Sequence, residues 1–183
     1  MVEQTKTRMT AAEFRQLPET NRLMELIHGE LIVSPSPIDA HQDLVFNLAV
    51  FIRGIMPGGK TVIAPMDVHL DDENALQPDV FWLAPDSRCT SQGGYYYGAP
   101  ELVVEVVSPA SSTRDRRDKF DLYEAHGARE YWLADPAAQH LEVWQRQGER
   151  FARLGIFTEG GSFHSVALDK TVTLTGIFPA ASQ

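Results

Sequence analysis

The sequence predicts a mixed α/β fold, and three observations carry that prediction. Residues 102–108 form a run that is apolar except for Glu105 and the final serine, which is typical of a central strand covered on both faces of a sheet. A helical segment, residues 111–123, separates this run from another at 130–136, so we expect two parallel strands joined by a right-handed crossover. Residues 141–178 alternate short apolar runs with glycine-containing turns, which predicts an antiparallel meander.

The elements at the N-terminus can be predicted in chain order. A capping box at Thr10 opens a short helix that Pro18 closes. Residues 24–27 and 30–33 then flank the dipeptide His28-Gly29, in which glycine tolerates a positive φ. This pattern predicts an N-terminal β-hairpin.

A second helix and further strands follow the stiff, extended connector at residues 34–37. Asp39 can cap this helix, whose apolar residues recur at helical spacing. Strands are expected at residues 61–70 and 78–83, and residues 91–98, with three tyrosines among glycines, are expected to form a loop.

Length and composition set bounds on the class of protein. The chain of 183 residues fits one domain, residues 1–183, with a substantial core. A net charge of -9 argues against broad electrostatic attraction to nucleic acid or anionic membrane, so any nucleic-acid contact must be local. The single cysteine, Cys89, excludes a disulfide framework within the monomer. Without a signal-like N-terminus or a long apolar span, we expect a cytoplasmic protein.

Two acidic residues lie in apolar surroundings where a charge is costly. Glu105 lies within the run Leu-Val-Val-Glu-Val-Val, and Asp79 precedes the apolar residues 80–83. An unpaired, ionised carboxylate in such a strand would cost several kcal/mol, so it must be paired, protonated or bound to a cation. Two such strands side by side would form a metal site.

These acids and several short motifs resemble one family of proteins. The element order (helix, three strands, helix, strand) with an acid on each of two strands resembles the PD-(D/E)XK nuclease superfamily. The chain is similar to a bacterial restriction-endonuclease-like family within it, a domain of unknown function, over about residues 20–140. The resemblance is carried by residues 25–31 (ELIHGEL), 34–37 (SPSP), His41, 77–80 (QPDV), 101–109 (ELVVEVVSP), 114–115, Lys119 and 130–136 (EYWLADP). It implies a restriction-endonuclease-like core, here with an N-terminal hairpin and a C-terminal meander.

The chain departs from the superfamily pattern at two positions. The superfamily places a lysine two residues after the strand acid, but this chain has Val107 there. Lys119, on the following helix, is the natural substitute, because related members move the lysine to that helix. The family usually has Asp or Asn in the hairpin turn where this chain has His28, which we expect to change only the turn chemistry.

The leading hypothesis is a metal-dependent endonuclease that hydrolyses DNA. Asp79, Glu105 and the main-chain carbonyl of Val106 would hold Mg²⁺ or Mn²⁺, and Lys119 would stabilise charge on the attacked phosphate. The remaining candidates, which could grip flanking phosphates or reach the site, are Arg114, Arg116 and Arg117, together with Glu30 and His41.

Other interpretations stay open at this point. A catalytically silent module of the same fold could bind nucleic acid or a partner protein, and Glu105 with Lys119 could be a buried structural ion pair. The tyrosines at residues 95–97 could stack bases or cover a dimer contact. The sequence does not specify DNA or RNA or the oligomeric state, although a homodimer is the favoured arrangement.

Overall fold

The computed structural model describes residues 8–18, 20, 22–108 and 113–178, and its side-chain detail excludes residues 113–115. The central sheet has the strand order β12-β11-β10-β9-β6-β3. Its members are β3 (Lys60–Ile63), β6 (Val80–Leu83), β9 (Leu102–Val106), β10 (Glu130–Asp135), β11 (His140–Gln147) and β12 (Arg150–Phe157).

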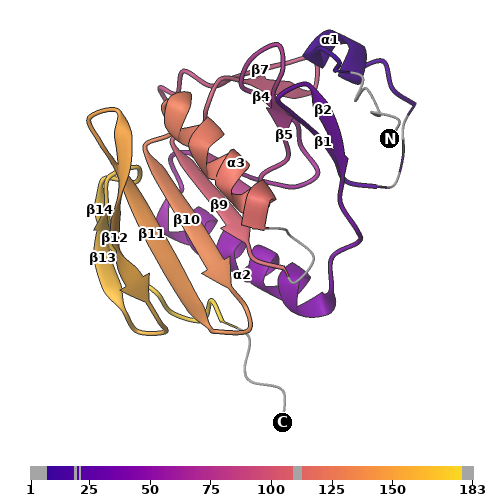
Figure 1. Cartoon of the computed structure of the whole chain (residues 1–183). Coiled ribbons are helices and arrows are strands. Elements are labelled where there is room, and N and C mark those ends of the chain that lie inside the picture. Colours follow the sequence, from indigo (N-terminus) through magenta and orange to yellow (C-terminus); the bar gives the residue numbers. More distant parts are fainter. Residues whose placement is uncertain (1–7, 19, 21, 109–112, 179–183) are drawn as a thin grey trace.

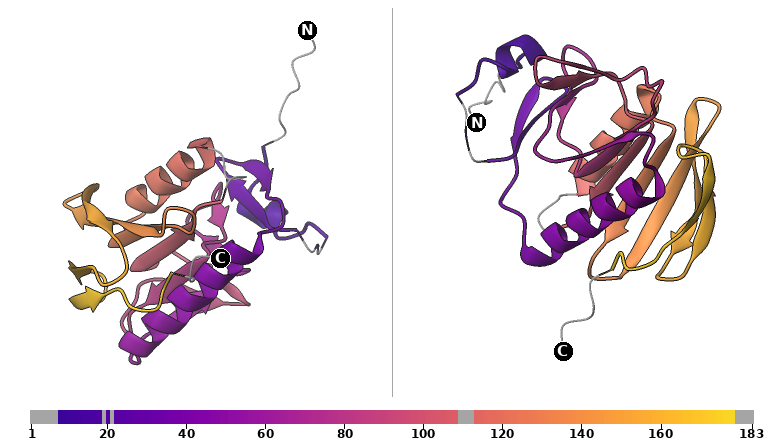
Figure 2. Two further views of the ribbon diagram at one scale, coloured as in Figure 1. Left: turned by 90° about the horizontal axis from the view of Figure 1, so that it is seen from below. Right: turned by 180° about the vertical axis from the view of Figure 1, so that it is seen from behind.

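The predicted core of helix, three strands, helix and strand is confirmed. Helix α2 (Asp39–Ile55) precedes the antiparallel strands β3, β6 and β9, and α3 (Thr113–Ala125) connects β9 to the parallel strand β10. Figure 1 and the rear view in Figure 2 show the two helices on opposite faces of the central sheet. The connection through α3 is the expected route between parallel neighbours.

Each face of the central sheet has its own apolar cluster, because the side chains of β9 alternate between the faces. Val104 and Val106 pack with Leu44 and Leu48 of α2. Val103, one residue along, packs instead with the α3 side in a second cluster that includes Tyr123. The strand is therefore covered on both faces, as its sequence predicts.

A second sheet has the order β2-β1-β5-β4-β8-β7. It contains the predicted hairpin, β1 (Met24–Ile27) and β2 (Glu30–Val33), in which His28 and Gly29 both have positive φ. Its other members are β4 (Val68–His69), β5 (Ala75–Leu76), β7 (Thr90–Gln92) and β8 (Tyr95–Tyr97).

Two expectations about this region are wrong. The predicted strand at residues 61–70 is two strands, β3 and β4, which belong to different sheets. Pro65 lies between them, and proline cannot donate to a strand ladder, so the chain leaves one sheet there. The predicted loop at residues 91–98 is the hairpin β7–β8, because Tyr96 is buried against Phe81 at 5.0 Å between ring centroids.

The ends of the predicted elements need smaller corrections. Thr10 forms the capping box with Glu13, but α1 (Ala11–Phe14) ends before Pro18. Asp39 is the first residue of α2 and not its cap, since the N-cap is Ile38 and makes no side-chain hydrogen bond. Within the predicted meander, residues 141–178, β11 and β12 pair antiparallel as expected, whereas β13 (Ser162–Ser165) and β14 (Lys170–Thr173) form a separate two-stranded antiparallel sheet.

Helices in the described ranges are too short or too polar to cross a membrane.

Candidate active site

Glu105 is a buried carboxylate on the central strand β9, directed toward α3. Its side chain accepts hydrogen bonds from the ammonium of Lys119 at 3.2 and 3.4 Å and from the hydroxyl of Tyr123 at 3.4 Å. Both donors lie on α3 and four residues apart, so they share one face of the helix. The apolar strand thus holds its carboxylate against a cation and a hydroxyl.

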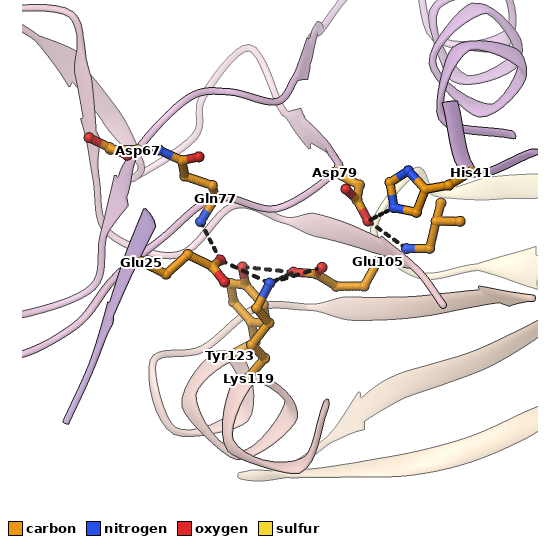
Figure 3. Close-up of polar contacts among 9 residues, drawn as sticks. Glu25, His41, Asp67, Gln77, Asp79, Glu105, Lys119 and Tyr123 are labelled. Carbon is orange, nitrogen blue, oxygen red and sulfur yellow. Dashed lines mark hydrogen bonds and ion pairs between the residues drawn. The ribbon is translucent and has the colours of Figure 1, made fainter. Parts of the chain in front are cut away.

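Lys119 bridges two carboxylates. Its Nζ lies 2.8 Å from Glu25 Oε1 and 3.2 Å from Glu105 Oε2, and the side chain is 14% exposed. Figure 3 shows the ammonium between Glu25 and Glu105. The predicted proximity of Lys119 to Glu105 is therefore present, and so is the buried ion pair of the structural alternative.

Asp79 lies at the start of β6, next to the middle of β9. Val80 pairs with Val104 in antiparallel register, so Asp79, the residue before β6, lies alongside the second half of β9. The Oδ2 atom of Asp79 accepts a 2.7 Å hydrogen bond from the main-chain N–H of Val106 and lies 3.4 Å from His41 Nε2. These contacts anchor the carboxylate to both β9 and α2 (Figure 3).

Glu25 and Gln77 extend the site toward the second sheet. Glu25 Oε1 accepts a 2.8 Å hydrogen bond from the main-chain N–H of Gln77, and the Gln77 Nε2 donates to Asp67 Oδ1 at 2.6 Å. The Gln77 Oε1 is buried and lacks a hydrogen-bond partner within the described residues. A buried acceptor of this kind, in a side-chain amide that contacts the Asp67 carboxylate, is suited to a bound water.

The electrostatics of this cluster favour a further positive charge. Burial raises the pKa of Glu105 to about 8, Lys119 opposes that rise, and the charges of Asp79 and Glu25 add to it. Burial lowers the pKa of Lys119, but Glu105 and Glu25 outweigh burial and hold that pKa well above its ordinary value. Burial and the charge of Glu105 raise the pKa of Tyr123, which stays a neutral donor. Two carboxylates thus contact one ammonium, and the charge of Asp79 also acts on it.

These residues line one cavity of about 260 Å³. Its polar lining includes Glu25, Gln77, Asp79, Glu105 and Lys119, and Arg116 also contributes to it. The connector at residues 34–37, which joins β2 to α2, forms another part of the wall. The cavity is thus built where the two sheets and both long helices meet.

The predicted site residues do not all reach this cavity. His41 and Arg116 line it, whereas Arg117 is exposed on α3 and Glu30 does not belong to its described lining. The side chain of Arg114 lies outside the described part of the chain.

Three polar residues of the cluster were not predicted as site residues: Glu25, Gln77 and Tyr123. Glu25 interrupts the apolar strand Met24–Ile27 as Glu105 interrupts its own strand, so the same signal could have identified it. Gln77 and Tyr123 carry no such signal, because a glutamine near a turn and a tyrosine on a helix face are ordinary. Only the approach of α3 and β5 to β9 gives them their role.

The donor set permits a magnesium ion held partly by the protein. Within the described ranges, no three His, Cys, Asp or Glu side chains are grouped so that they could hold a metal ion. Magnesium does not require such a group, because it is commonly bound by one or two carboxylates with water and substrate phosphates. The carboxylates of Asp79 and Glu105, which line the same cavity, fit that chemistry.

Comparisons with known proteins agree with this architecture. The crystal structure of "a putative nuclease belonging to DUF820" from Anabaena variabilis superposes with a TM-score of 0.73 at 20% sequence identity, covering 88% of this chain and 91% of that one. An uncharacterized protein of Synechocystis sp. is 29% identical over 155 residues, which are 82% of this chain and 88% of that protein. The model of the Uma2 family, described as "Putative restriction endonuclease", matches residues 11–175. The chain therefore belongs to the Uma2 family.

Proposed function

We propose that this protein is a metal-dependent endonuclease that hydrolyses phosphodiester bonds in DNA. The observation that carries the proposal is that Asp79, which immediately precedes β6, and Glu105, on the neighbouring strand β9, line one cavity, with the Lys119 ammonium beside Glu105. The membership in the Uma2 family supports the nuclease class.

Asp79 and Glu105 would hold Mg²⁺ or Mn²⁺, with the carbonyl of Val106 as a third oxygen. The N–H of Val106 donates to Asp79, while the N–H of Val107 donates to Ala134 on β10. Because the N–H and C=O of one strand residue point the same way, the Val106 carbonyl is directed to the Asp79 side of β9. The bound ion would polarise the scissile phosphate and lower the pKa of bound water.

The remaining side chains have roles in orientation and charge. Glu25 and Glu105 fix the Lys119 ammonium at the cavity, where it would stabilise negative charge developing on the attacked phosphate. His41 holds Asp79 from the α2 side. Arg116 lines the cavity and would contact a flanking phosphate, which provides local positive charge on an acidic chain.

A second candidate is a catalytically silent module that binds nucleic acid or a partner protein. It is favoured by Val107 at the superfamily lysine position and by the pairing of Lys119 with two carboxylates. In that case Glu25, Glu105 and Lys119 form a structural ion cluster. The homodimer also stays a prediction.

Conversion of supercoiled plasmid to nicked or linear DNA tests the proposal, with Mg²⁺, with Mn²⁺ and with EDTA. We expect cleavage by the wild type in either metal, loss of cleavage in Asp79→Asn, and unchanged cleavage in the matched control Asp86→Asn at an exposed position. An RNA substrate run in parallel tests the DNA assignment. Absence of metal-dependent cleavage of both nucleic acids, with folded protein, would favour the silent module.

A further inference from the structure

A second cavity adjoins the acidic one, on the other side of Asp79. Its volume is about 880 Å³. The two cavities share five lining residues: Leu23, Pro37, His41, Gln77 and Asp79. A polymer strand bound at the acidic cavity can therefore extend into the second cavity.

The second cavity has the chemistry of a nucleotide site. Arg15 and Arg22 contribute positive charge, and Tyr95 contributes an aromatic ring. The guanidinium carbon of Arg15 lies 6.0 Å from the centroid of the Tyr95 ring. Asp67 adds a carboxylate to the lining, but that carboxylate accepts the 2.6 Å hydrogen bond from Gln77. Paired aromatic and arginine groups stack nucleobases, and arginine also contacts phosphate.

Tyr95 is held in place by its surroundings and differs from its two neighbours in lining the second cavity. It pairs with Gln92 across the β7–β8 hairpin, and its ring contacts His69 edge-on at 5.4 Å between centroids. Tyr96 is buried in the core and Tyr97 stacks on His69 at 5.2 Å. Neither Tyr96 nor Tyr97 belongs to the described lining of the second cavity, so Tyr95 alone of the three is available to a base there.

The size and concave shape of the second cavity favour an unpaired nucleotide over a base-paired one. A cavity of this volume is within the range of small-molecule sites, about 300 to 1,000 Å³, and so suits a single nucleotide. Bases in a duplex are paired and stacked, so extracting one requires free energy, whereas an unpaired base enters without that cost.

We infer that the second cavity binds an unpaired nucleotide adjacent to the scissile phosphate, so that the preferred substrate is DNA whose strand is single-stranded beside the cleaved bond. The inference rests on the proposed function, because it takes the acidic cavity as the place of cleavage. It adds the substrate class and assigns Tyr95 and Arg15 as the residues that select it.

Binding measurements test this inference separately from cleavage. Fluorescence anisotropy with a labelled 12-nucleotide single strand and a blunt 12-base-pair duplex gives Kd values for the wild type, both with Ca²⁺ and with EDTA. The variants are Tyr95→Leu, which keeps apolar bulk without the aromatic ring, and Arg15→Gln. The matched controls are Tyr97→Leu on the same strand and Arg153→Gln on β12, which lie outside the described lining.

We expect the wild type to bind the single strand about 10-fold or more tighter than the duplex. The Tyr95→Leu variant loses one base–aromatic stacking contact, so we expect it to bind the single strand at least about 5-fold more weakly than the wild type. Its affinity for the duplex and the affinities of both control variants should be unchanged. Equal affinity for the two DNA forms, or equal loss in Tyr95→Leu and Tyr97→Leu, would overturn the inference even if plasmid is cleaved. If no DNA is cleaved but only Tyr95→Leu loses affinity for the single strand, the result supports the nucleotide cavity and contradicts the proposed endonuclease activity.

Discussion

The replacement of Lys119 by methionine tests the buried ion cluster most directly. In the folded protein this ammonium lies 2.8 Å from Glu25 and 3.2 Å from Glu105, and methionine has a similar length without the charge. Removal of one partner from a buried ion pair costs about 3 to 5 kcal/mol, because the remaining charge is left uncompensated. We expect Lys119→Met to lower the free energy of unfolding by about that amount when both carboxylates are ionised.

The loss should depend on pH, and the direction follows from Glu105. Burial raises the pKa of Glu105 from its ordinary value of 4.5 to about 8, so the folded state binds this proton more tightly than the unfolded state. Stability from this group is therefore fully present below about pH 4.5 and is lost as the pH rises through 8. Lys119→Met removes the charge that opposes the shift. The variant should be penalised most at pH 9 and less at pH 6, where Glu105 can take up a proton.

Urea unfolding followed by circular dichroism at pH 6 and pH 9 measures both quantities. Arg117→Met, an exposed cation on the same helix, is the matched control and should change the free energy of unfolding by less than about 0.5 kcal/mol. A loss below about 1 kcal/mol in Lys119→Met at pH 9, or a larger loss at pH 6, would refute the ion cluster as described.

Two further predictions concern the metal and a distant contact. Mg²⁺ at about 100 times its Kd should raise the free energy of unfolding of the wild type by about 2.7 kcal/mol, which is measured as a higher melting temperature. Asp79→Asn should abolish this increase. An unchanged wild-type melting curve would count against the metal site. Glu124 on α3 accepts hydrogen bonds from the Phe151 N–H at 2.5 Å and from Arg150 at 2.8 Å, so Glu124→Gln should lower the free energy of unfolding by about 1.5 to 3 kcal/mol at pH 7. Burial raises the pKa of Glu124, but these donors outweigh it and give a net lowering, so the difference should shrink as the pH falls below 4.5; equal losses at pH 7 and pH 3 would contradict this reasoning.

The sequence determined the central sheet and its two acids because these depend on local pattern. An apolar run that will be covered on both faces is recognisable from about seven residues. A carboxylate within such a run costs free energy on burial, whichever elements cover the strand. The same holds for the capping box of Thr10 and for the hairpin turn at His28-Gly29, which are confirmed. The parallel direction of β9 and β10 followed because a helix between two strands of one sheet forms the crossover that parallel strands require.

Contacts between distant parts of the chain were decided only by the tertiary structure. Glu25 meets Gln77 across 52 positions, and Lys119 meets both Glu25 and Glu105, so the ion cluster exists only once two sheets and α3 pack together. Residues 61–70 were predicted as one strand because apolar residues recur on both sides of Pro65. That proline is a local signal for the division, whereas the neighbours that pair with β3 and with β4 are decided by the tertiary structure. The second cavity likewise has no sequence signal, because Arg15 and Tyr95 acquire a common environment only when α1 and β8 lie beside Asp79. The local sequence pattern shows where burial of a charge is costly. The partner that offsets this cost comes from a distant part of the chain, so it is known only from the tertiary structure.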